Sequence, residues 1–152
     1  MTDLLQILAA GIGTVAFGAL FGVPSKYYPY CGLIGASGWA VYVFLWMRAG
    51  FWSEAVVVFL ATVLVILMSR FFAVRERCPV TIFLICGILP LVPGAGIYRT
   101  VYYLIQGDQA LSLYYLVVTL HTAGAIALAI FITDSVVNLV HLYHEGSHAR
   151  RN

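Results

Sequence analysis

Five long stretches of the chain carry no charged residue. They comprise residues 4–25, 27–47, 55–69, 78–98 and 109–133. A helix needs about 20 residues, at about 1.5 Å each, to cross a hydrocarbon core of about 30 Å. Four of the stretches reach that length, and we predict that each forms a transmembrane helix.

The third stretch is shorter than the others. It becomes long enough if its helix continues through Arg70 to residue 72, because a long arginine side chain can extend its guanidinium to the headgroups. We therefore predict an all-α, polytopic membrane protein of five transmembrane helices. These form a single domain, residues 1–138, which is followed by a short cytoplasmic tail, residues 139–152.

The composition leads to the same class of protein. Of the 152 residues, 62% are hydrophobic and 9% are charged, whereas a soluble domain is about half apolar and about a quarter charged. So few charges cannot cover the surface of a soluble domain of this size. The apolar composition predicts a lipid bilayer as the surroundings, and the net charge of +2 without a basic stripe predicts no nucleic-acid partner.

The basic residues divide unevenly between the two sides that five spans define. Six of the eight fall on the side of the C-terminus: Lys26, Arg70, Arg75, Arg77, Arg150 and Arg151. Short cytoplasmic loops carry the excess of lysine and arginine. We predict a multi-pass protein of the cytoplasmic (inner) membrane, with its N-terminus outside and its C-terminus in the cytoplasm.

Glycines recur at helical spacing in the first two spans. Gly18 and Gly22 are four residues apart, which predicts a small-residue pair that lets a second helix approach closely. The second span also contains closely spaced glycines, Gly32, Gly35 and Gly38. These glycines are interpreted chiefly as packing positions.

The fourth span contains two prolines and two glycines within seven residues: Pro90, Pro93, Gly94 and Gly96. Neither proline has an N–H to donate to the preceding turn, and the glycines relax the backbone where a helix would otherwise recover. We predict a broken helix at residues 90–96, and a structural kink is the simpler alternative.

The two predicted half-helices cover residues 79–89 and 95–106. The second half begins with unpaired N–H groups and a positive dipole end, which together favour an anion. Broken helices of transporters bind a substrate carboxylate in this way. Arg99, just over one turn into the second half, either adds to the anion site or anchors at the outer headgroups.

Two ionisable residues of the fifth span, His121 and Asp134, are candidates for proton coupling, because ionisable residues inside a membrane are functional candidates by default. His121 is flanked by Thr119 and Thr122 and is also explained by hydrogen bonds to them. Asp134 is also explained as part of a solvated helix end.

Three further histidines, His141, His144 and His148, recur near the C-terminus. A zinc site requires three or four well-placed ligands, and a fourth ligand is not evident. We therefore predict no metal site and no cofactor.

Residues 35–38 match the G-x-S-G pattern of rhomboid intramembrane proteases. In that reading Ser37 is the nucleophile and His121 its base. A four-residue match in a glycine-rich helix is weak support, and we predict that the chain is not an enzyme.

Four features of the sequence are considered together: the five-span layout, residues 21–24 leading into residues 31–35, the Ser-Arg pair at 69–70, and the Pro-x-x-Pro-Gly element at 90–94. Together they resemble the threonine/serine exporter family, and in particular its small, half-size membrane subunit. The chain is also similar to the small subunit of two-component succinate exporters.

The resemblance implies a half-subunit of a secondary transporter that exports small carboxylate-bearing solutes: threonine and serine, or a dicarboxylate such as succinate. It also implies a partner, a second membrane half of the same family. An odd number of spans would place that half in the opposite orientation, as in inverted repeats. A scaffold subunit that transports nothing itself is the main alternative.

Overall fold

The computed structural model describes residues 2–49 and 53–149, and the side chains of residues 47–49, 138 and 140–149 are outside that description. The described part of the chain consists of helices joined by short connections, without strands. Its elements in order are α1 (Thr2–Leu20), η1 (Ser25–Tyr27), α2 (Tyr28–Tyr42), η2 (Val43–Ala49), α3 (Glu54–Glu76), α4 (Val80–Ile88), η3 (Leu89–Leu91), α5 (Gly94–Ile105) and α6 (Gln109–Ala149).

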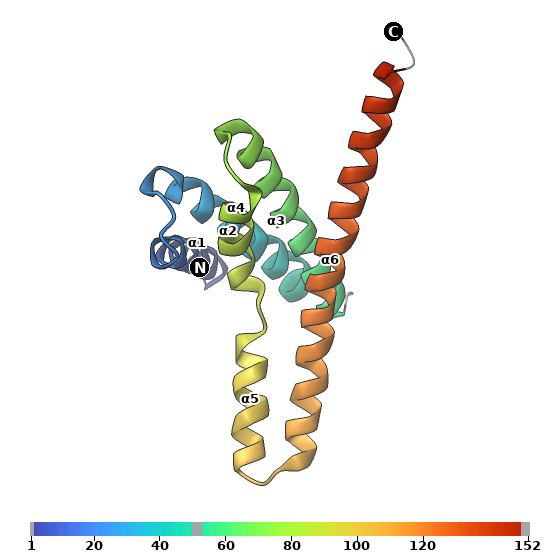
Figure 1. Cartoon of the computed structure of the whole chain (residues 1–152). Coiled ribbons are helices and arrows are strands. Elements are labelled where there is room, and N and C mark those ends of the chain that lie inside the picture. The colour runs from blue at the N-terminus through green and yellow to red at the C-terminus, as the bar shows by residue number, and fades with distance from the viewer. Residues whose placement is uncertain (1, 50–52, 150–152) are drawn as a thin grey trace.

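Helix α2 packs between α1 and α3 through its glycines (Figure 1). A Cβ built on Gly38 would lie 2.6 Å from Cγ2 of Val65 on α3, and one built on Gly35 would overlap the side chain of Thr14 on α1. These contacts leave no room for a larger residue, because a branched side chain of the neighbouring helix packs directly on each glycine. The packing role predicted for the glycines of the second span is confirmed.

Gly22 has a different role from the one the spacing predicts. It lies beyond the end of α1 with a φ of +72°, and a Cβ there would meet no atom within 4 Å. The amide of Val23 donates to the carbonyl of Gly18 across this residue at 2.9 Å. Gly22 therefore ends α1 in the left-handed conformation that favours glycine, and the prediction that it pairs with Gly18 at a helix interface was wrong.

The core of the chain lies where α2, α3 and α4 meet. Ile34, Val65 and Phe83, one from each helix, are fully buried. The Phe83 ring also contacts Tyr27 edge to face, with ring centroids 5.5 Å apart. These apolar contacts hold α4 against the bundle as far as Leu91, which is also buried.

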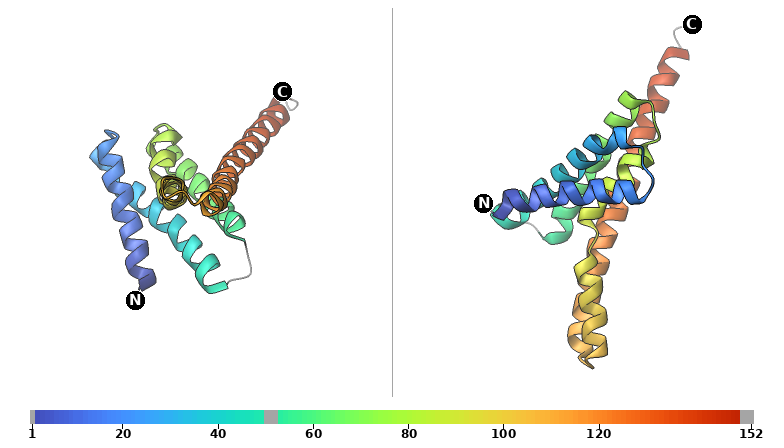
Figure 2. Two further views of the ribbon diagram at one scale, coloured as in Figure 1. Left: turned by 90° about the horizontal axis from the view of Figure 1, so that it is seen from below. Right: turned by 90° about the vertical axis from the view of Figure 1, so that its left-hand side faces the viewer.

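Beyond α4 the chain leaves the bundle. Helix α5 and the first part of α6 run side by side as a hairpin that projects away from α1–α4, and α6 then continues alongside α3, against which it packs (Figures 1 and 2). The Ser112 hydroxyl on α6 donates to the Thr100 carbonyl on α5 at 2.9 Å. No residue of α5 is buried among the described residues. This helix therefore packs against α6 alone over most of its length.

Among the described residues, three helices are long and apolar enough to cross a membrane: Thr2–Leu20, Glu54–Glu76 and, within α6, Gln109–Val137. The bent pair Val80–Leu91 and Gly94–Ile105 makes a fourth if it counts as one span. The second predicted span is divided into α2, of 15 residues, and the π-helical turn η2, of 7 residues. The all-helical membrane fold is confirmed, and the number of five spans stays a prediction.

Helix α6 is long. It continues through residue 138 to Ala149 as one helix of 41 residues. The predicted boundary between a transmembrane domain and a tail therefore falls within a continuous helix, and the structure does not test it.

Candidate functional site

The helical path is interrupted between Leu91 and Gly94, as the prolines predict. Val92 is extended, with φ −62° and ψ 130°, and the two helical segments meet at an angle of 49°. Pro90 lies within the short η3 turn and Pro93 immediately precedes α5, where its missing N–H breaks no helical hydrogen bond. The predicted break is confirmed, and its half-helices begin and end within a residue or two of the predicted positions.

The first turn of α5 presents free backbone amides. The amide of Gly94 donates to the Val92 carbonyl at 2.7 Å, and that of Ile97 donates to the Pro93 carbonyl at 3.1 Å. The amides of Ala95 and Gly96 lie between them in the first turn, where no preceding helical carbonyl is available. These amides and the helix dipole give this end of α5 a partial positive charge.

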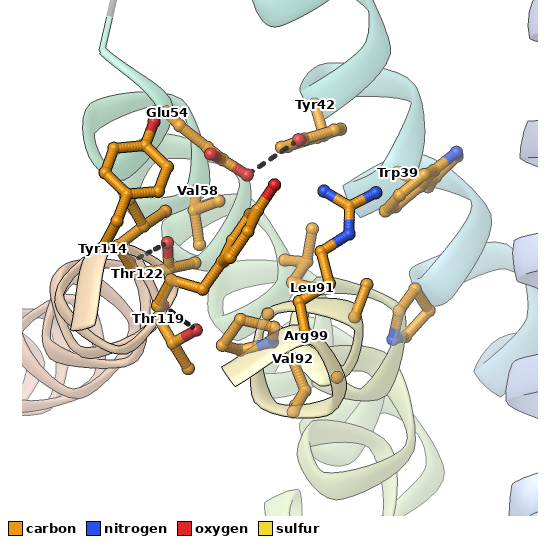
Figure 3. Close-up of a pocket in the computed structure, with 17 residues that line it drawn as sticks. Trp39, Tyr42, Glu54, Val58, Leu91, Val92, Arg99, Tyr114, Thr119 and Thr122 are labelled. Carbon is orange, nitrogen blue, oxygen red and sulfur yellow. Dashed lines mark hydrogen bonds between the residues drawn. The ribbon is translucent and has the colours of Figure 1, made fainter. Parts of the chain in front are cut away.

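A cavity of about 400 Å³ opens beside the break, between α5, α6 and the ends of α2 and α3 (Figure 3). The predicted site residues Pro90, Pro93, Gly94, Gly96 and Arg99 all line it. Its other lining residues are Trp39, Tyr42, Glu54, Val58, Leu91, Val92, Ala95, Tyr114, Tyr115, Val118, Thr119 and Thr122. The structure thus brings the elements of the predicted carboxylate site into one space.

Arg99 supplies a full positive charge to this cavity. Its guanidinium carbon lies 5.4 Å from the centre of the Tyr115 ring, within the range of a cation–π contact. Across the part of the chain that the structure describes, no carboxylate forms an ion pair with Arg99. Its N–H groups are therefore available to an anion in the cavity.

The cavity also contains a carboxylate that sequence reasoning did not single out. Glu54 begins α3, and the Tyr42 hydroxyl at the end of α2 donates to its Oε1 at 3.1 Å. In the sequence Glu54 is simply the charge before the third hydrophobic stretch. Only the packing of α3 beside the break places it in the same cavity as Arg99.

Two threonines of α6 form part of the cavity wall. Thr119 donates its hydroxyl to the Tyr115 carbonyl at 2.7 Å, and Thr122 donates to the Val118 carbonyl at 3.0 Å (Figure 3). Each hydroxyl oxygen retains acceptor capacity after this bond. Thr119 also packs directly on Gly96 of α5, so it joins the two helices at the break.

The two residues considered for proton coupling lie outside the cavity. His121 is exposed on α6, and the adjacent threonines donate to backbone carbonyls and not to its ring. Asp134 accepts a hydrogen bond from the guanidinium of Arg70 on α3. This contact joins α3 to α6, and the expectation that the Arg70 guanidinium reaches the headgroups stays a prediction.

The structure describes the residues of one of the two remaining sequence hypotheses, the protease pair Ser37 and His121. The Ser37 hydroxyl donates to the Ile34 carbonyl at 2.8 Å and lies 3.0 Å from Sδ of Met68, without a hydrogen bond to His121 within the described chain. The side chains of His141, His144 and His148 lie outside the described residues. Within those residues, no group of three His, Cys, Asp or Glu side chains is placed to bind a metal ion.

Comparison with known proteins identifies the family. The family described as "Threonine/Serine exporter, ThrE" matches residues 6–136, a range that contains the bundle, the break and the cavity. No solved structure matches the chain. The long apolar helices make it a multi-pass membrane protein, and the chain belongs to the threonine/serine exporter family, a family of transporters.

Proposed function

We propose that this chain is one half of a secondary transporter that exports small carboxylate-bearing solutes across the cytoplasmic membrane. The solutes are threonine and serine, or a dicarboxylate such as succinate. The observation that carries the proposal is the cavity at the break, which is lined by Arg99 and by the first turn of α5, where the helix amides lack helical partners.

The proposed binding mode follows from these groups. The solute carboxylate accepts hydrogen bonds from Arg99 and from the amides of Ala95 and Gly96. Hydrogen bonds to an ionised group are worth about 1.5–3 kcal/mol each, and the α5 dipole adds about 0.3–1 kcal/mol. Two or three such contacts are enough for the millimolar to micromolar affinity at which a solute can be both bound and released.

A second membrane half of the same family is the proposed partner. Irregular backbone at membrane depth is tolerated only where protein or a water-filled cavity covers it. The outer face of α5 is apolar and exposed, with Tyr98 at 68% and Ile105 at 80%. A half of opposite orientation, as in inverted repeats, would cover this face and close the cavity. This arrangement assumes five spans, with the N-terminus outside and the C-terminus in the cytoplasm.

Proton coupling remains a proposal for His121 and Asp134. Neither side chain lines the cavity, so either would act on the cavity through the movement of α6. His121→Gln or Asp134→Asn is expected to reduce the dependence of efflux on the proton gradient while saturable binding persists. Equal gradient dependence in both variants and in the parent chain would remove these residues from the mechanism.

Transport is tested with vesicles loaded with labelled threonine, serine and succinate, prepared with and without the partner half. Efflux of at least one solute should depend on this chain and respond to an imposed proton gradient. Full transport by this chain purified without any second membrane subunit would contradict the pairing. The absence of efflux of all three solutes, with both halves present, would contradict the proposed substrates.

A scaffold role is separated from transport by the double substitution Pro93→Ala with Gly94→Ala. A Cβ on Gly94 would meet no atom within 4 Å, so the variant is expected to assemble. A transporting half should then lose flux because the substitutions change the backbone at the start of α5, on the cavity wall, whereas a scaffold should retain the flux of its partner.

A further inference from the structure

Glu54 and Arg99 place opposite charges in the same cavity. Glu54 comes from the first turn of α3 and Arg99 from the second turn of α5. Figure 3 shows both side chains directed into the space beside the break, with the Tyr42 hydroxyl between them in this view. The two charged groups are held on different helices and do not form an ion pair with each other.

The position of Glu54 is fixed by a contact that lies within the cavity. The Tyr42 hydroxyl donates to Oε1 at 3.1 Å, which leaves the second carboxylate oxygen and further lone pairs for another donor. Tyr42 itself is held by stacking on Trp39, with ring centroids 4.9 Å apart. The carboxylate is thus oriented by aromatic side chains of α2.

We propose that Glu54, positioned by Tyr42, binds the ammonium group of a zwitterionic amino acid whose carboxylate is bound by Arg99 and the α5 amides. This assignment rests on the proposed function of the same cavity. An α-amino acid carries both charges on one carbon and bridges the two groups. A dicarboxylate would place its second negative charge beside Glu54, and that repulsion discriminates against it.

A first-turn acid also stabilises a helix N-terminus through the dipole, and Glu54 has that position in α3. If Glu54 only stabilises the N-terminus of α3, its replacement should lower the stability of the chain and leave the preference between solutes unchanged. The ammonium role affects the preference between solutes that differ only in the amino group. Threonine and 3-hydroxybutyrate are such a pair, because they share the carboxylate and the 3-hydroxyl.

The experiment uses the full chain, purified in the assembly that it forms in the membrane. The rise in its unfolding temperature with added threonine or 3-hydroxybutyrate gives the apparent Kd of each compound. The parent protein is expected to prefer threonine, and Glu54→Gln should lower the threonine preference by about tenfold or more, as expected for the loss of a charge-assisted contact. Tyr42→Phe leaves the carboxylate in place and should lower the same preference by about twofold to tenfold.

An unchanged preference in both variants would overturn the assignment, as would an equal loss of affinity for both compounds. Arg99→Gln tests the proposed function separately from the role of Glu54. It should weaken the binding of threonine and of 3-hydroxybutyrate equally, because both carry the carboxylate. Undiminished binding of both compounds to Arg99→Gln would contradict the carboxylate site itself, whatever Glu54→Gln shows.

Discussion

Replacing Gly96 with alanine tests the contact that joins α5 to α6 at the cavity. A Cβ at this position would overlap Oγ1 of Thr119 and lie 3.4 Å from its Cβ. Overpacking of this kind costs about 1–3 kcal/mol, while alanine is preferred over glycine in a helix by up to about 1 kcal/mol. We expect a net loss of about 1 kcal/mol in the free energy of unfolding.

Gly96→Ala should no longer destabilise the chain once the Thr119 side chain is shortened. In a Thr119→Ala background the overlapping hydroxyl is absent, so Gly96→Ala should be neutral or stabilising by up to about 1 kcal/mol. The coupling energy of the double-mutant cycle is then the overpacking term, about 1–3 kcal/mol. Gly94→Ala is the matched control, because its Cβ meets no atom within 4 Å.

The assay is equilibrium unfolding in lipid–detergent micelles, followed by circular dichroism and repeated for the parent, the two single variants, the double variant and the control. The same proteins are then compared for efflux, which should fall for Gly96→Ala and recover in part in the double variant. If Gly96→Ala has the same effect as Gly94→Ala in the parent chain, and the same effect with and without the Thr119 side chain, α5 does not pack on Thr119 as described.

Three other outcomes follow from the structure. Gly35→Ala should destabilise the chain by about 1–3 kcal/mol, because its Cβ would overlap Thr14 where α1 meets α2; unaltered unfolding would contradict this packing. Arg70→Gln and Asp134→Asn should show a coupling energy of about 0.2–1 kcal/mol in a double-mutant cycle, since these side chains are 26% and 44% exposed; strictly additive effects would argue against the ion pair. Arg99→Gln should raise the solute concentration for half-maximal efflux by about tenfold or more, and Arg99→Lys less; equal values for the parent and both variants would exclude Arg99 from the site.

The features that sequence reasoning placed correctly are local ones. Pro90 and Pro93 lack the N–H that a continuous helix requires, so the break follows from the residues themselves. The glycines of α2 indicated close packing because a buried helix face of small residues has few other uses in a membrane.

The features that it missed depend on contacts between distant segments. Tyr42 lies within the second predicted span and Glu54 just before the third, and nothing in the order of residues places them beside a break in another helix. The pairing of Arg70 with Asp134 likewise requires α3 and α6 to be adjacent. Gly22 was misassigned because its spacing from Gly18 fits a helix, whereas α1 has already ended at Leu20.

The most direct test of the carboxylate site is protection of a cysteine placed inside it. Ala95→Cys, on the cavity wall, is compared with Leu128→Cys on an exposed part of α6, both in a background without the native cysteines. Threonine, serine or succinate should slow thiol modification at residue 95 but not at residue 128, with half-protection at the concentration that half-saturates efflux. Identical rates at residue 95 with and without solute, while efflux remains saturable, would show that the solute binds elsewhere.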